Sequence, residues 1–336
     1  MYQQVVLGEH GRMTASTMRY VGPALVIARG NELELGMREH DAVLRERGRA
    51  RRVRVVEASP HPLDRARLWR RARLSRTASA SRVPLGTLVA LGASGELVAS
   101  IEEAPPRVSA DELICRSAPL PPEPALVVVR AMADALAALE AHACCPLLVR
   151  PDTVHVAHDG AVRITLLPAR DPRADVRDAP MDRHDVAWVA PECCRGHEPD
   201  LRAAMCSLGM ALVELCAGPV VERSTMMEHI RARAYGESPL ELLRDRAVPD
   251  ALRLVIARCT SVERGSRLSS FAELRAHLDS LGATDPRATR ELAELVRVGF
   301  PAALRELSTP ELPADVAAPE GVYTEVEVPP YPALAH

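Results

Sequence analysis

The stretch HACCPLLVRPDTVHVAHDGAVRITLLPAR, from His142 to Arg170, contains two apolar runs separated by an Asp159-Gly160 turn. Apolar runs that flank such a turn predict a strand, a short loop and a second strand. A long helix is predicted directly before this stretch, over Leu126–His142, and the sequence after it is mostly helical in pattern up to residue 283. The chain is therefore expected to combine helices and strands in an α+β fold.

The first hundred residues are richer in strand patterns. RRVRVVEA (Arg51–Ala58) and GTLVALGASGELVASIEEA (Gly86–Ala104) predict strands, and the second is expected to form a hairpin around Ala93-Ser94-Gly95. Between them, Pro62–Arg76 has the spacing of an arginine-rich helix. Residues 1–105 are thus expected to form a β-rich domain with a helical interruption.

The remaining chain divides into three segments. A proline-rich stretch, Ala118–Ala125, precedes the long helix, and Asp285–Leu307 predicts one more helix. Ser308–His336 is rich in proline and glutamate and has no periodicity, which is typical of a loosely held tail. We therefore expect a mainly helical domain over 106–283, a C-terminal helix over 284–307 and a flexible tail over 308–336.

The overall composition argues against several classes of partner. The chain of 336 residues is 47% hydrophobic and has a formal net charge of −3, so nothing attracts it globally to nucleic acid or to a membrane. All 42 basic residues are arginine, and the chain contains no lysine. No basic-apolar signal peptide follows Met1 and no uncharged run is long enough to span a bilayer, so we expect a cytoplasmic protein.

The 8 cysteines include two adjacent pairs, Cys144-Cys145 and Cys193-Cys194, with His142 and His197 close by in the sequence. Such a cluster raises the alternative of a metal site. Adjacent cysteines, however, lack the C-x2-C spacing that chelates zinc well. We interpret them as reduced thiols that pack as small hydrophobic residues, and we expect no metal.

Five motifs resemble landmarks of the large lobe of Hanks-type (bacterial Ser/Thr) protein kinases, in the same order over about 130 residues. They are RPDTVHV (Arg150–Val156), similar to the catalytic-loop exit; HDGAVRIT (His158–Thr165), similar to the strand leading to D-F-G; VAPEC (Val189–Cys193), similar to the A-P-E that closes the activation segment; SLGMALVELCAGP (Ser207–Pro219), similar to the hydrophobic central helix; and CTSVERGSRLSSFAEL (Cys259–Leu274), similar to the segment carrying the structural arginine.

This resemblance implies a two-lobed protein kinase-like fold, with a β-rich small lobe and a mainly helical large lobe. It also implies a structural ion pair between Glu192 of the A-P-E motif and Arg267. The match to the small lobe is weaker. LGEHGRMT (Leu7–Thr14) resembles a glycine-rich loop, but His10 and Met13 stand where glycines would let the backbone approach phosphate, so we interpret it as a strand turn.

The chemistry of the family is missing from the matching positions. The H-R-D triplet of the family falls on Pro146, Leu147 and Leu148. The metal-binding asparagine falls on Thr153, and the D-F-G triplet falls on Leu166, Leu167 and Pro168. Leucine offers magnesium none of the oxygen ligands that it requires. Base and metal ligands are therefore absent together, and we expect no catalytic residues, no metal and no cofactor.

The phosphate clamp is missing as well. The small-lobe lysine that holds phosphates in kinases has no counterpart, because the chain has no lysine. Arg54 in the strand RRVRVV is the candidate to replace it, although its planar fork differs from a lysine point charge. The carboxylate that usually pairs with this cation is also missing, since no Asp or Glu lies between Arg65 and Gly95.

The segment that activation normally modifies, Pro168–Glu192, contains no Ser, Thr or Tyr and cannot take an activating phosphate. Within it, Arg183-His184-Asp185 suggests a displaced catalytic triplet. Its order and context are wrong for that role, so we interpret it as solvated loop charge.

The sequence thus predicts a catalytically inactive pseudokinase that acts as a regulatory or scaffolding module in signalling. Its expected partner is a protein, such as an active kinase or another signalling protein, and Tyr323–Leu334 could serve as an extended docking segment. The alternative is a serine/threonine kinase-related enzyme with atypical nucleotide or phosphoryl chemistry. A third reading, an RNA- or anion-binding surface on the arginine-rich helix, is less usual than a solvated helix face, so nucleic acid is not expected.

Overall fold

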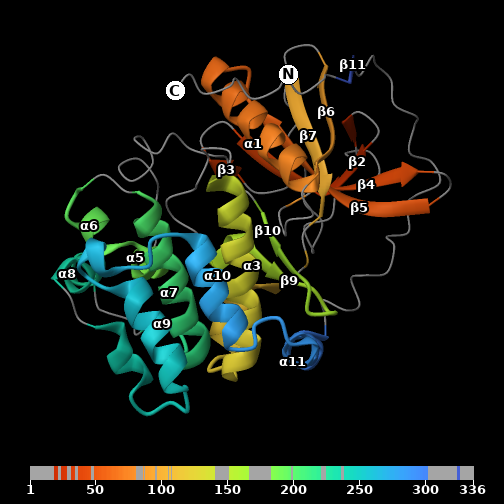
Figure 1. The fold of residues 1–336 in the computed structure, drawn as a ribbon. Coiled ribbons are helices and arrows are strands. Elements are labelled where there is room, and N and C mark those ends of the chain that lie inside the picture. Colours follow the sequence, from red (N-terminus) through yellow and green to blue (C-terminus); the bar gives the residue numbers. More distant parts are fainter. Residues whose placement is uncertain are drawn as a thin grey trace. The chain divides into compact units, whose positions relative to one another are not determined.

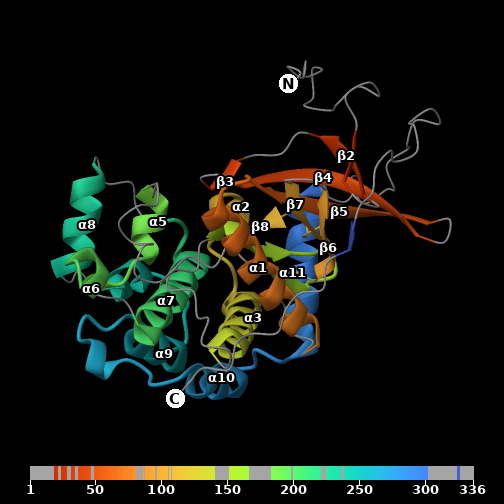
Figure 2. The same cartoon turned by 90° about the horizontal axis from the view of Figure 1, so that it is seen from above.

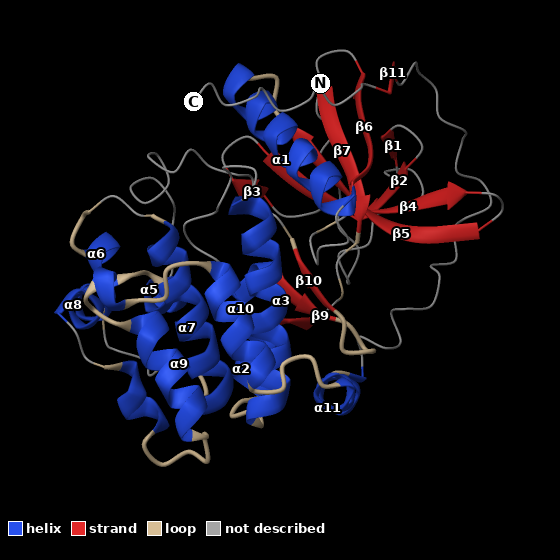
Figure 3. Cartoon of the chain, in the orientation of Figure 1, coloured by secondary structure: helices blue, strands red, loops and turns tan. Residues whose placement is uncertain are grey.

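The structure is a computed structural model, and the statements below concern the residues that it describes. These are residues 19–21, 24–28, 32–34, 37–46, 49–80, 86, 88–94, 97–104, 106, 108–140, 151–165, 183–197, 200–220, 225–235, 238–301 and 324–325. They form two compact units, one of residues 19–104 with 324–325 and one of residues 106–301. The first is mostly strand and the second mostly helix (Figure 3), which confirms the α+β class.

The first unit is an antiparallel sheet with one long helix, α1 (Pro62–Ala80), lying along it (Figure 1). The strand order is β1-β2-β4-β5-β7-β6-β11, and β3 pairs with β4. The strands are β1 (Arg19–Val21), β2 (Ala24–Ala28), β3 (Glu32–Glu34), β4 (Met37–Glu46), β5 (Arg49–Ala58), β6 (Leu88–Ser94), β7 (Leu97–Glu103) and β11 (Thr324–Glu325). The predicted strands over 51–58 and 86–104 and the helix from Pro62 are confirmed.

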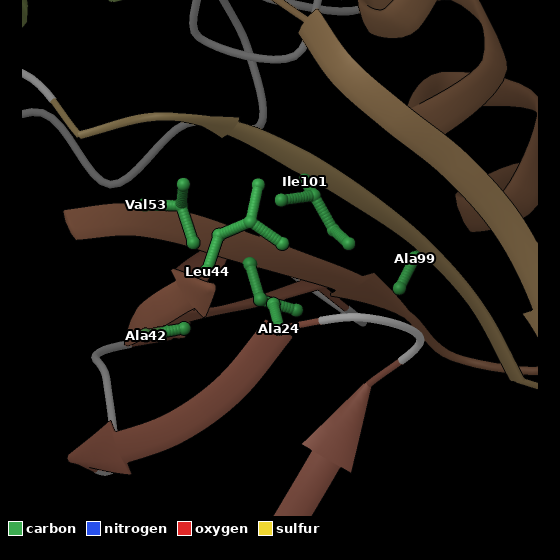
Figure 4. Close-up of a cluster of buried hydrophobic side chains, with 7 residues drawn as sticks. Ala24, Ala42, Leu44, Val53, Ala99 and Ile101 are labelled. Atoms are coloured by element: carbon green, nitrogen blue, oxygen red, sulfur yellow. The ribbon is translucent and has the colours of Figure 1, made fainter. Parts of the chain in front are cut away.

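The sheet buries apolar side chains on both faces, because successive residues of a strand point to opposite sides. Val53 and Val55 of β5 belong to one buried cluster with Leu44 and Ile101 (Figure 4). On the other face, α1 packs against β5, β6 and β7. The buried side chains there are Met37, Val56, Ala58, Leu68, Ala72, Leu91 and Val98.

The second unit is a helical assembly with a small sheet, in the order β10-β9-β8. Its elements are β8 (Val108–Ser109), α2 (Ala110–Ser117), α3 (Pro122–Glu140), η2 (Pro151–Thr153), β9 (Val154–Val156), β10 (Val162–Ile164), α5 (Arg183–Trp188), α6 (Pro191–Cys194), α7 (Leu201–Ala217), α8 (Met226–Tyr235), η3 (Pro239–Leu243), α9 (Asp250–Thr260), η4 (Arg264–Ser266), α10 (Phe271–Ser280) and α11 (Pro286–Gly299). Helix α7 contacts α3, α5 and α9, and Figures 1 and 2 show it beside α9.

Helix α7 is buried along nearly its whole length, from Ala203 to Cys216. Gly209 lies where α7 meets α9: a Cβ atom there would be 2.6 Å from the Cβ of Cys259 and from the Cγ2 of Thr260. The glycine therefore lets the two helices approach closely. The helix ends at Ala217 and is followed by Gly218 as its C-cap. Gly218 has a φ of 99°, a backbone conformation that residues other than glycine rarely adopt.

We expect Gly209→Ala to destabilise the second unit by about 1–3 kcal/mol, because the added methyl group overpacks the α7–α9 contact. The higher helix propensity of alanine works in the opposite direction by less than about 1 kcal/mol. Urea denaturation measures the difference. Gly265→Ala is the matched control, since nothing lies within 4 Å of the Cβ position there. Equal stability of the two variants would contradict this packing role.

The strand-turn-strand unit predicted around Asp159-Gly160 is confirmed as β9 and β10. The Asp159 carboxylate accepts a hydrogen bond from the Ala161 amide at 2.9 Å, and Gly160 has a φ of 82°. A Cβ atom on Gly160 would lie 2.3 Å from the Thr289 carbonyl oxygen of α11. Helix α11 thus packs against this turn as well as against α2 and α3, and it belongs to the helical unit.

Two predicted helix boundaries were wrong. Helix α3 begins at Pro122, inside the proline-rich stretch, because proline is tolerated in a first turn, where amides have no intrahelical acceptor. The helix predicted over Asp285–Leu307 is interrupted after Gly299, where α11 ends, and residues 302–307 lie outside the described residues. Phe300 leaves the helix with φ −132° and ψ 58°, as expected for a residue before a proline, here Pro301.

Of the tail Ser308–His336, the structure describes only Thr324 and Glu325. These two residues form β11, which pairs antiparallel with β6 opposite Ala93 and Gly92. The tail has no hydrophobic periodicity to predict a strand, but the unpaired backbone of an edge strand can bind almost any extended segment.

Among the described helices, none combines the length and the apolar character needed to cross a membrane.

Candidate functional site

The first unit contains a buried ionic network on the face of the sheet that α1 covers. Arg54 of β5 and Glu102 of β7 lie opposite each other in the strand register. Arg54 Nη2 donates to Glu102 Oε2 at 2.8 Å, and Arg54 Nη1 donates to both carboxylate oxygens of Glu39, on β4, at 3.2 and 3.3 Å. The strand cation is therefore held between two carboxylates of its own sheet.

Helix α1 adds a second arginine to the same carboxylate. Arg71 donates to Glu102 through Nε at 2.6 Å and through Nη2 at 2.8 Å, a bidentate geometry. Ser100 adds a hydrogen bond to Glu102 Oε1 at 3.1 Å. The side chains of Arg71 and Glu102 are each only 1% exposed, so Glu102 is a shared buried acceptor that ties the helix to β5 and β7.

The electrostatics of the network favour the charged carboxylate. Burial by itself would raise the pKa of Glu102, but the adjacent guanidinium groups of Arg71 and Arg54 hold that pKa at about 2. Burial disfavours the charge on Arg54 as well, yet Glu102 and Glu39 raise the pKa of Arg54 above its usual value. Arg54 stays charged, and its charge is compensated within the protein.

No motif in the sequence indicated this network. The interval from Arg65 to Gly95, where the resemblance places the partner of Arg54, contains no carboxylate, whereas the actual partners lie on β4 and β7 and helix α1 supplies a second cation. Strand alternation could have indicated the pair. Arg54 shares a face with the buried Val56, and Glu102 shares that face with Val98. A charge at a buried position of a strand predicts an ion pair.

Of the seven degenerate kinase positions, the structure describes only Thr153, which is buried in η2. Its carbonyl accepts hydrogen bonds from the Thr165 amide at 2.7 Å and from Thr165 Oγ1 at 3.2 Å, and His155 Nε2 lies 3.3 Å from that hydroxyl. These contacts involve no carboxylate. The other positions, namely Pro146, Leu147, Leu148, Leu166, Leu167 and Pro168, lie outside the described residues, as do Leu7–Thr14.

The structure brings Glu192 and Arg267 together in a bidentate ion pair. Arg267 Nη1 and Nη2 each donate to one Glu192 oxygen at 2.6 Å, and both residues are buried. Arg267 also donates to the backbone carbonyls of Ser261 at 2.7 Å and Arg202 at 2.8 Å. Burial would raise the pKa of Glu192, but the hydrogen bonds from Arg267 bring it below the usual value. The pair connects α6 to the loop before α10.

The segment Val186–Cys193, which contains this glutamate, is held at further points. Ser207 of α7 donates to the Trp188 carbonyl at 2.7 Å, and the Trp188 indole N–H donates to the buried Glu214 of α7. Arg233 of α8 donates to the Val189 carbonyl at 3.1 Å. We call Val186–Cys193 the clamped segment, because two helices and a loop fix its backbone and side chains.

No protein-family model matches the chain, and no curated protein matches it at a significant level.

The residues around the clamped segment offer little reactive chemistry. The pKa of Cys193 is raised to about 12 and that of Cys194 to about 11, mainly by burial, so both thiols stay protonated at neutral pH. Within the part of the chain that the structure describes, no group of three or more His, Cys, Asp or Glu residues is arranged to hold a metal ion.

Arg183-His184-Asp185 is the first half of helix α5 and not a loop, which corrects the prediction for this tripeptide. Because α5 packs against α7 and α8, the tertiary contacts stabilise a helix here that the charged sequence alone does not indicate.

Proposed function

We propose that the chain is a pseudokinase, a protein kinase-like protein that does not transfer phosphate and acts as a regulatory or scaffolding module for a signalling protein. Three findings support the proposal. The motifs of the large lobe follow one another in the family order. A strand-rich unit with one packed helix precedes a helical unit. Glu192 and Arg267 form the ion pair that the resemblance implies.

The observation that carries the inactive assignment is the environment of Arg54. This arginine is the candidate for the phosphate-binding cation, since the chain has no lysine. Glu102 and Glu39 already occupy its guanidinium group, and Arg71 completes the charge balance of the buried network. A triphosphate would have to displace both carboxylates from a buried arginine, which leaves Glu39 without this partner and Glu102 with Arg71 alone.

The clamped segment supports a binding role over a switched enzyme. Kinase-type activation rearranges a loop when a hydroxyl side chain gains a phosphate that arginines can bind. Here the segment from Pro168 to Glu192 has no hydroxyl side chain, and its end is fixed by Trp188 and Glu192. A buried segment that is held in one conformation and has no phosphate acceptor is not a phosphorylation switch, which favours a role without this kind of activation.

We expect the purified chain to transfer no phosphate from labelled ATP to itself or to generic protein substrates, with magnesium or manganese. ATP at millimolar concentration is also expected to leave the melting temperature unchanged, and magnesium to add nothing. The melting temperature is a sensitive measure of ATP binding, because a ligand at 100 times its dissociation constant adds about 2.7 kcal/mol to the free energy of unfolding.

The decisive control compares wild type with Arg54→Met in the same preparation. A contaminating kinase gives the same signal in both. ATP labelled separately at the α- and γ-phosphates tests the alternative of nucleotide transfer. Transfer of either label that persists through further purification and is lost in the variant would overturn the inactive assignment.

The partner is expected to be a protein. Pull-down of the chain from its native cells, followed by mass spectrometry, is expected to recover a signalling protein such as an active kinase. Recovery of nucleic acid in place of protein, with steep salt dependence, would contradict this part of the proposal.

A further inference from the structure

We draw no further inference here: the strongest candidate, the side-chain cluster of Cys193, Cys194 and Cys206 beside Arg233 in the second unit, offers largely buried thiols, and nothing in the part of the chain that the structure describes shows which ligand or reactant would reach them.

Discussion

Replacing Glu192 or Arg267 with alanine is expected to destabilise the second unit by about 3–5 kcal/mol, because each change leaves the other charge buried without its partner. The side chains are 5% and 0% exposed, so water cannot take the place of the missing group. The loss is a large fraction of the stability of a typical domain. Urea denaturation followed by Trp188 fluorescence in a Trp69→Phe background reports on this unit selectively, since Trp188 is buried against α7.

The double variant separates a true ion pair from two independent contributions. We expect Glu192→Ala with Arg267→Ala to cost much less than the sum of the single changes, because no uncompensated charge remains. Glu263→Ala is the matched control, since Glu263 is exposed and alanine there should cost less than about 0.5 kcal/mol. Additive effects would show that the two residues act separately.

Glu102→Ala is expected to have an effect of similar or larger size on the first unit, about 3–5 kcal/mol, because one change leaves two buried arginines without their shared acceptor. Hydrogen exchange in α1 and in β5–β7 is expected to accelerate, since Glu102 ties the helix to the sheet. Glu103→Ala is the matched control: this neighbour on the same strand is exposed and pairs with Arg51 at the surface. Equal stability of the two variants would contradict the role assigned to Glu102.

The pH dependence checks the same network. The folded-state pKa of Glu102, at about 2, lies below its usual value of 4.5, so its stabilisation is complete above pH 4.5 and is lost as the pH falls towards 2. The stability advantage of wild type over Glu102→Gln is therefore expected to shrink by about 2 kcal/mol between pH 6 and pH 3. An advantage that stays constant over this range would mean that the Glu102 carboxylate is not held ionised by Arg54 and Arg71.

Replacing the three most buried charged residues of the network with apolar residues tests whether the network stabilises the fold beyond balancing its own charges. Arg54→Met, Glu102→Leu and Arg71→Met together are expected to be close to neutral for stability, because the desolvation cost of three charges disappears along with their attraction and Glu39, whose side chain is 25% exposed, can be hydrated in place of its bond to Arg54. A large loss of stability in this triple variant would show that the network contributes more than charge compensation.

Much of the local structure was determined by the sequence on its own. Strand alternation over Arg51–Ala58, the helical spacing from Pro62 and the Asp159-Gly160 turn each depend on neighbouring residues, and all three are present as predicted. The pair of Glu192 and Arg267 is a long-range contact, but it could be anticipated because both residues belong to motifs that resemble a known family. Where neither short-range pattern nor motif was available, the predictions failed.

Only the tertiary structure decided the contacts between segments that have neither a short-range pattern nor a recognisable motif. The partners of Arg54 are Glu39 and Glu102, and the register of three neighbouring strands brings these residues together. The helix at Arg183 depends on packing against α7 and α8, and β11 depends on the open edge of β6. In each case the stabilising free energy comes from groups far away in the sequence. Neighbouring residues in the sequence determine the intrinsic helix or strand propensity of a segment. They do not include the distant residues against which the segment packs.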